Sequence, residues 1–260
     1  MTRPLTKGKV KNIRSAYVEL KSLGKVSRLF RISKSTAHKY IYDLAPHQNI
    51  ITSLRSNDQR LLGTYVGLWM GDGTQYYDDN FTIKICSNKK DVLLNKFIQE
   101  IIFNLFGKTS SLNGDSKTSR AYVRFHSKFI YDFISNYVQH ENNKTHSVRL
   151  KYDIDSYSTE FLEGCLLGLT LSDGYLKKCF VFNVTSERLS TNMKDILIKF
   201  GFNPRLYTFK RERFGHKDLQ SIRLIVKESR IVENLLDKVI LDLGYHYSFN
   251  ELKYSREQIK

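Results

Sequence analysis

One long internal repeat restricts the fold of this chain more than any other feature. Residues 62–73 read LGTYVGLWMGDG, and residues 163–174 read EGCLLGLTLSDG, at an offset of 101 positions (174 − 73). The similarity continues downstream, where residues 81–85 match residues 180–184 at an offset of 99 (180 − 81). Self-similarity of this kind indicates two copies of one structural unit. We therefore expect two related half-domains.

Each copy mixes the spacing of strands with the spacing of helices. Apolar residues alternate at Phe81, Ile83 and Ile85, which is typical of a half-buried strand. They then recur at helical spacing, for example at Phe97 and Ile101. The order helix, strands, helix, strands, helix predicts two α+β lobes related by a pseudo-two-fold axis.

Small residues recur at every fourth position of each motif and therefore line one face of a helix. They are Gly63, Gly67, Gly71, Gly164, Gly168 and Ser172. Glycine costs a helix about 1 kcal/mol relative to alanine, so repeated glycines on one face require a reason. The close approach of another backbone is such a reason, and we expect the two motif helices to pack against each other.

Each motif helix ends at an Asp-Gly pair, Asp72-Gly73 or Asp173-Gly174. If the helices pack face to face, two carboxylates meet at the negative ends of two helix dipoles, which is unfavourable without a cation. Oxygen ligands with no His or Cys nearby favour Mg²⁺, or a similar ion, over zinc. One Asp-Gly pair alone would be an ordinary turn, but two after matched glycine series indicate metal-assisted phosphodiester hydrolysis.

The formal net charge of +16 indicates a polyanionic partner, and nucleic acid is favoured over acidic lipid. Residues 1–60 hold 13 Lys and Arg against 3 Asp and Glu, so the excess is concentrated at the N-terminal end. The three cysteines have no C-x-x-C spacing, which argues against a disulfide framework or a zinc site. With no apolar stretch typical of a signal peptide or membrane span, we expect a soluble, intracellular protein that does not bind membranes.

Residues 1–50 show helical spacing of apolar residues three times in succession, up to Leu44, which predicts three short helices. We expect Gly24 to separate the first two, and Ser33 or Ser35 to cap the third. The polar face of the third helix presents Lys34, Ser35, Thr36, His38 and Lys39. Such groups reach base edges and phosphates in helix-turn-helix proteins, although an ordinary three-helix bundle with a solvated basic face has the same pattern.

We place a linker at residues 51–57 and the two half-domains at residues 58–150 and 151–260. The nonapeptides YVGLWMGDG (65–73) and LLGLTLSDG (166–174) resemble the two motifs of single-chain LAGLIDADG homing endonucleases. The resemblance implies two αββαββα half-domains that form a DNA-binding saddle, preceded here by the small all-α helix-turn-helix module.

The same resemblance implies the roles of several residues. Asp72 and Asp173 would bind Mg²⁺ or Mn²⁺, supported by the backbone carbonyls of Gly71 and Ser172. Lys144 would be the basic catalytic residue, unless it is a solvated loop lysine, and the second copy shows no clear counterpart. The polar residue that ends the strand after each motif would be Ser87 or Ser186.

Outward-pointing strand residues should contact DNA in a major groove. In the first lobe they are Thr82, Lys84, Arg120, Tyr122 and Arg124, and in the second Asn183, Arg205, Tyr207 and Arg223. A basic hairpin at residues 210–217, which is otherwise a solvated turn, would bind phosphates through Lys210, Arg211, Arg213 and Lys217.

These features predict a site-specific endonuclease that makes a metal-dependent double-strand break at a long, asymmetric target in double-stranded DNA. We expect a monomer, since both motifs lie in one chain. Two alternatives share the scaffold: a maturase that binds intron RNA, and a helix-turn-helix transcription regulator. The regulator would not need both Asp72 and Asp173, and their joint presence favours the nuclease.

Overall fold

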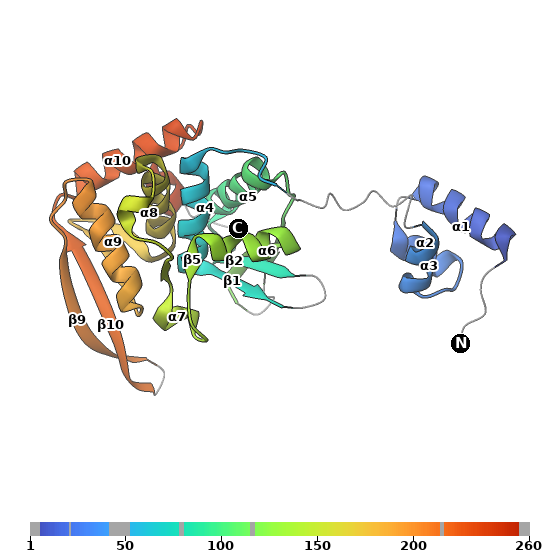
Figure 1. The fold of residues 1–260 in the computed structure, drawn as a ribbon, viewed down its shortest axis with the longest axis horizontal. Coiled ribbons are helices and arrows are strands. Elements are labelled where there is room, and N and C mark those ends of the chain that lie inside the picture. The colour runs from blue at the N-terminus through green and yellow to red at the C-terminus, as the bar shows by residue number, and fades with distance from the viewer. Residues whose placement is uncertain are drawn as a thin grey trace. The chain divides into compact units, whose positions relative to one another are not determined.

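The computed structural model describes residues 6–20, 22–41, 53–77, 81–114, 118–213 and 216–254. The chain divides into two compact units, residues 1–50 and residues 51–260. Figure 1 shows the three helices of the first unit and the α+β architecture of the second. No helix among the described residues is long and apolar enough to cross a membrane.

The N-terminal unit contains α1 (Lys7–Leu20), α2 (Leu23–Leu29) and α3 (Lys34–Ile41). Its small core is formed by Ile13, Val26, Ala37 and Ile41. The break between the first two helices differs from our expectation, because Ser22 caps α2 and Gly24 lies inside that helix. Of the two candidate caps of α3, Ser33 accepts a hydrogen bond from the backbone N–H of Thr36 at 3.0 Å. Leu44 lies outside the described residues.

The first half of the larger unit has the predicted order of elements. It comprises α4 (Gln59–Asp72), β1 (Gly73–Tyr76), β2 (Thr82–Asn88), α5 (Val92–Phe106), β3 (Ser111–Gly114), β4 (Arg120–His126) and α6 (Lys128–Phe133). A connecting region follows, with β5 (Val138–Gln139), α7 (Lys144–Ser147) and β6 (Arg149–Leu150). Two short 3-10 helices, Ile134–Asn136 and Ile154–Ser156, lie in the same region.

The second half repeats the order and adds a short helix. It comprises α8 (Thr159–Asp173), β7 (Gly174–Leu176), β8 (Phe180–Val184), α9 (Glu187–Lys199), β9 (Arg205–Arg213), β10 (His216–Val226), α10 (Ser229–Asp242) and α11 (Phe249–Tyr254). The predicted α+β fold with two αββαββα halves is therefore confirmed.

The two sheets have the same topology. Their strand orders are β1-β2-β4-β3 and β7-β8-β10-β9, with all neighbours antiparallel. Lys84 pairs with Arg124 in the first sheet, and Asn183 pairs with Arg223 in the second. The two pairs are related by the offset of 99 that the sequence repeat shows, so equivalent residues occupy equivalent places in the two sheets.

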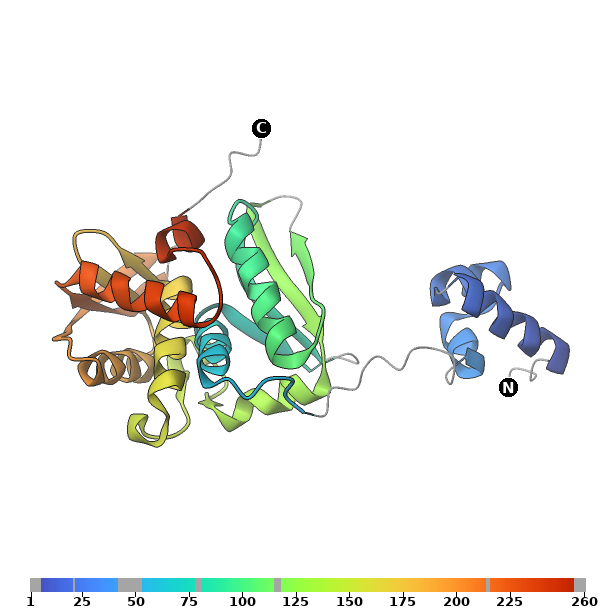
Figure 2. The ribbon, with the colours of Figure 1, turned by 90° about the horizontal axis from the view of Figure 1, so that it is seen from above.

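The motif helices α4 and α8 pack face to face between the two halves (Figures 1 and 2). A Cβ atom on Gly63 would lie 2.0 Å from the carbonyl oxygen of Phe161, and one on Gly168 would lie 2.3 Å from that of Thr64. These distances are too short for any side chain. The repeated glycines therefore permit a backbone-to-backbone contact, as their spacing predicted.

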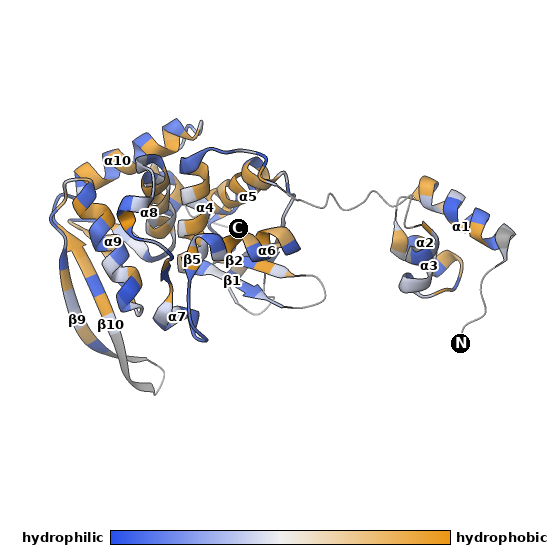
Figure 3. Ribbon diagram, in the orientation of Figure 1, coloured by the Kyte–Doolittle hydropathy of each residue, from blue (hydrophilic) through white to orange (hydrophobic). Residues whose placement is uncertain are grey.

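One ion-pair network joins the two halves at the N-terminal end of α4. The Arg60 Nε donates to Glu163 Oε2 at 2.6 Å, and Arg60 Nη2 lies 3.4 Å from Asp242 Oδ2. Glu163 is only 8% exposed. Most other residues of α4 and α8 are apolar and buried. Figure 3 shows that hydrophilic residues lie instead on outer helices such as α9 and α10.

Candidate functional site

Asp72 and Asp173 lie at the C-terminal ends of α4 and α8, where the two helices meet. A Cβ atom on Gly71 would lie 2.9 Å from the Oδ2 of Asp173 and 2.0 Å from the Ser172 hydroxyl. This close packing brings the two carboxylates to one place. Burial, together with the charge of Asp72, raises the pKa of Asp173 to about 7. Burial also raises the pKa of Asp72, while two lysines act in the opposite direction.

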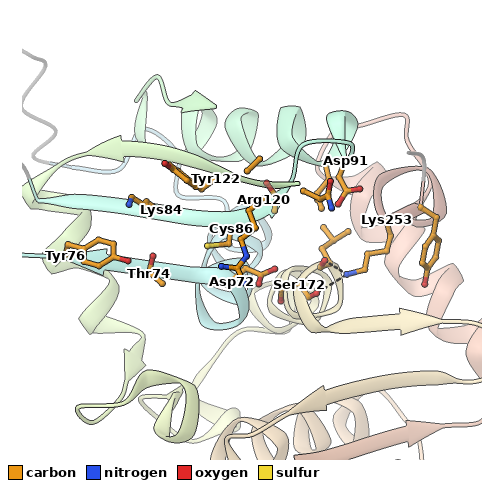
Figure 4. A pocket seen from close by; sticks show the side chains of 16 residues that line it. Asp72, Thr74, Tyr76, Lys84, Cys86, Asp91, Arg120, Tyr122, Ser172 and Lys253 are labelled. Carbon is orange, nitrogen blue, oxygen red and sulfur yellow. Dashed lines mark hydrogen bonds between the residues drawn. The ribbon is translucent and has the colours of Figure 1, made fainter. Parts of the chain in front are cut away.

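Lys144 and Lys253 place their ammonium groups beside these helix ends. The Lys144 Nζ donates to the carbonyl oxygens of Gly73 at 2.6 Å and Gly71 at 3.3 Å. The Lys253 Nζ donates to the carbonyl oxygens of Leu171 at 2.5 Å and Ser172 at 3.0 Å. Dashed lines in Figure 4 mark the hydrogen bonds of Lys253. Each lysine thus neutralises the negative end of one motif helix.

The expectation that the second copy has no counterpart lysine was wrong, because Lys253 is that counterpart. The two lysines have different places in the chain: Lys144 precedes the second motif, whereas Lys253 lies on α11, after α10 and at the end of the second half. One signal was available. Each lysine follows the last helix of the αββαββα order in its half, α6 or α10, so the segment after α10 is where a counterpart of Lys144 is expected.

The two lysines are themselves electrostatically perturbed. Burial lowers the pKa of Lys144 to about 8, although the charges of Asp72 and Asp173 partly compensate. Burial lowers the pKa of Lys253 as well, with the same carboxylates opposing it. Lys144 also lies 4.8 Å from the centre of the Trp69 ring. Two carboxylates and two ammonium groups, all on partly exposed residues, are therefore held together at the ends of the motif helices.

The groups at the helix ends fit a hard divalent cation. Asp72 and Asp173 supply carboxylate oxygens, and the carbonyl oxygens of Gly71 and Ser172 lie in the same place. Each carbonyl accepts a lysine hydrogen bond but has a second lone pair for a metal. Among the described residues, no group of three or more His, Cys, Asp or Glu side chains is placed so that it could hold a metal ion. All-oxygen coordination suits Mg²⁺, Mn²⁺ or Ca²⁺ better than zinc.

A groove of about 880 Å³ leads from Asp72 over the first sheet. Its floor includes Lys84 and Arg120, and Ser172 and Lys253 from the second half close one end (Figure 4). The Lys84 ammonium lies 4.9 Å from the ring centre of Tyr76 and 4.9 Å from that of Tyr122. The groove is therefore cationic and aromatic, a combination that suits nucleic acid.

The two serines that we expected beside scissile phosphates differ, because Ser87 lines the groove and Ser186 does not. The Ser87 hydroxyl donates to Asn95 Oδ1 at 2.5 Å. Ser186 is 1% exposed, and its hydroxyl donates to the Val148 carbonyl at 2.8 Å while capping α9. Cys86, the residue before Ser87, also lines the groove.

Most predicted strand residues lie on the sheet face that is not covered by helices. They are Lys84, Arg120, Tyr122, Arg124, Asn183, Arg205, Tyr207 and Arg223, all of them exposed or partly exposed. Thr82 is an exception, because it is 1% exposed and its hydroxyl bonds His126 Nδ1 at 3.0 Å. Lys210 lies four residues after Leu206 on the same strand, and Leu206 pairs with the core residue Leu224. The Lys210 side chain therefore leaves the strand on the face that the helices cover. The side chains of Arg211, Arg213 and Lys217 lie outside the described residues.

The predicted face of α3 is largely accessible. Lys34, Ser35 and Lys39 are exposed, and Thr36 is partly exposed with its hydroxyl 2.7 Å from that of Ser33. The side chain of His38 lies outside the described residues. The basic face of the third helix therefore stands free of the core of its own unit.

No family model and no curated protein matches the sequence. Among solved structures, the chain is similar to the homing endonuclease I-DmoI in complex with DNA and Ca, with 13% identity and a TM-score of 0.50. This likeness covers 73% of the present chain and 100% of that chain. The N-terminal LAGLIDADG domain of DUF199/WhiA is also similar, with 11% identity, a TM-score of 0.46 and coverage of 79% and 91%. The chain therefore shares the fold of I-DmoI, as its two motifs predicted.

Proposed function

We propose that the protein is a metal-dependent DNA endonuclease of the homing type, which makes a double-strand break at a specific site. The observation that carries this proposal is the convergence of Asp72 and Asp173 at the ends of two tightly packed helices. Burial raises the pKa of both carboxyls, so a cation bound between them would stabilise their ionised forms. A protein that only bound DNA would not need both carboxylates.

Different residues of the chain would bind the metal and stabilise the phosphate in such a reaction. Asp72 and Asp173 would hold the cation, with the carbonyls of Gly71 and Ser172 in support. When bound, a divalent cation supplies a Lewis acid and an activated water. Lys144 and Lys253 already bond the same backbone segments, at 2.5 to 3.3 Å, and are placed to stabilise the charge that develops on a phosphate nearby. The uncovered sheet faces would hold the duplex.

The experiment is cleavage of a plasmid library of candidate target sites, with and without Mg²⁺. Asp72→Asn and Asp173→Asn should abolish cutting while DNA binding persists. Asp132→Asn is the matched control, because Asp132 is an exposed carboxylate that forms an ion pair with Lys128 on its own helix, α6. Intact DNA bound equally by all the proteins would refute the nuclease. Preferential binding and splicing of structured RNA would indicate a maturase.

A DNA-binding regulator is the second candidate, and the N-terminal unit favours it. Its third helix exposes Lys34, Ser35 and Lys39 on one face, as a DNA-recognition helix would. In the nuclease, the same unit would extend the recognised sequence or slow product release. A chain that starts near Asn57 and still binds and cuts its site as tightly as the full chain would contradict that role.

A further inference from the structure

The uncovered face of the second sheet holds a guanidinium group in a defined orientation. The Arg223 Nε on β10 donates to the Asn183 Oδ1 on β8 at 3.0 Å. The guanidinium carbon of Arg223 lies 4.9 Å from the centre of the Phe209 ring on β9. Three neighbouring strands of the sheet, of which β9 and β10 are labelled in Figure 1, thus fix one arginine.

The direction of the hydrogen bond decides what Arg223 can still do. Arginine has only donors, so the amide oxygen of Asn183 must face it, however the amide group is assigned. Because Nε is engaged, the two terminal nitrogens remain for a ligand. The aromatic contact restricts rotation of the guanidinium plane, which lowers the entropy cost of binding. Arg223 therefore presents a flat, oriented pair of donors.

The equivalent place in the first sheet is built differently. Lys84 stands where Asn183 stands in the second sheet, and it faces Arg124 across the same pair of strands. Two cations cannot hydrogen-bond each other. The Arg124 Nε is buried and has no hydrogen-bond partner within the part of the chain that the structure describes. The first half therefore lacks the acceptor that orients Arg223.

We propose that Arg223 reads a guanine in the major groove through O6 and N7, with Asn183 as its positioning residue. This inference rests on the proposed function, in which the uncovered faces bind duplex DNA. Guanine offers two acceptors at the spacing of an arginine fork, whereas adenine places a donor at one of those positions. The second half therefore discriminates more strictly at this base pair than the first half does at the equivalent one.

The test measures base preference, not cleavage. Duplexes that bind the full chain are selected from a random pool with Ca²⁺ in place of Mg²⁺, and affinities are then compared for the four base pairs at each selected position. Wild type should prefer G at one position by on the order of tenfold or more. Asn183→Asp keeps an acceptor for Arg223 and should keep this ratio. Asn183→Leu has a similar size but no acceptor, and should lose most of this G preference.

Three results would overturn the inference. An unchanged G preference in Asn183→Leu would show that Asn183 does not position the arginine. An unchanged preference in Arg223→Lys, which keeps the charge but not the fork, would show that Arg223 does not read the base. If Arg223→Lys instead lost the same affinity for all four base pairs, Arg223 would contact a phosphate and not a base. Wild type that binds no duplex would instead overturn the proposed function itself, and melting curves identify any variant that fails to fold.

Discussion

Replacing Gly67 by alanine tests whether the packing of α4 against α8 holds the two halves together. A Cβ atom at Gly67 would lie 2.4 Å from the carbonyl oxygen of Cys165, 2.9 Å from the backbone nitrogen of Leu169 and 3.0 Å from the Cα of Gly168. All three atoms belong to the backbone of α8 and cannot rotate away. The helices must therefore separate by about 1 Å to restore normal contact, and a gap of that size loses up to half of the dispersion energy locally.

The expected magnitude follows from two opposing effects. Alanine gains about 1 kcal/mol of helix propensity over glycine. Overpacking of a tight interface costs about 1–3 kcal/mol, and the rigid contacts at Gly67 place the cost at the upper end. The net loss is then about 2 kcal/mol, which lowers the melting temperature of a unit of this size by about 4–8 °C.

Thermal unfolding followed by far-ultraviolet circular dichroism measures this change directly. Gly8→Ala is the control, because Gly8 also lies in a helix but a Cβ there would meet nothing within 4 Å. The control should not lower the melting temperature. Gly67→Ala should also reduce cleavage, since Asp72 and Asp173 move apart with their helices. A melting temperature at or above that of wild type would refute the interpretation of the glycine series.

Three further predictions concern the charged groups. Asp173→Asn should raise the melting temperature of the metal-free protein near neutral pH. The pKa of the Asp173 carboxyl is raised to about 7 in the folded protein, so the stability that this group contributes is present below its pKa in the unfolded chain. That stability is lost as the pH rises through about 7. Melting curves in EDTA across pH test this, and a stabilising effect that grows toward acid pH would contradict it. Lys253→Met should lower the cleavage rate, with the exposed Lys238→Met as its control; equal rates in single-turnover assays would remove Lys253 from the site. Arg60→Leu should cost about 3 kcal/mol because it leaves Glu163 buried without its partner, and the added Glu163→Leu change should recover most of this in denaturant titrations.

The architecture could be predicted because its signals lie in neighbouring residues. The repeat at 62–73 and 163–174 required two like halves, and apolar periodicity assigned their helices and strands. Glycine at every fourth position specified a helix-to-helix contact, because no other residue tolerates such an approach. That contact in turn predicted that Asp72 and Asp173 meet. Each step needed only the chain geometry of a single element and the symmetry of the repeat.

The remaining features depend on contacts between residues far apart in the sequence, for which no local pattern exists. Lys253 reaches Leu171 and Ser172 only because α11 folds back onto the end of α8. Strand alternation correctly predicted which face Arg223 occupies, but its bond to Asn183 required the register of β8 with β10. Pairing of strands and docking of helices are set by the packing of the whole core, and only the tertiary structure decides them.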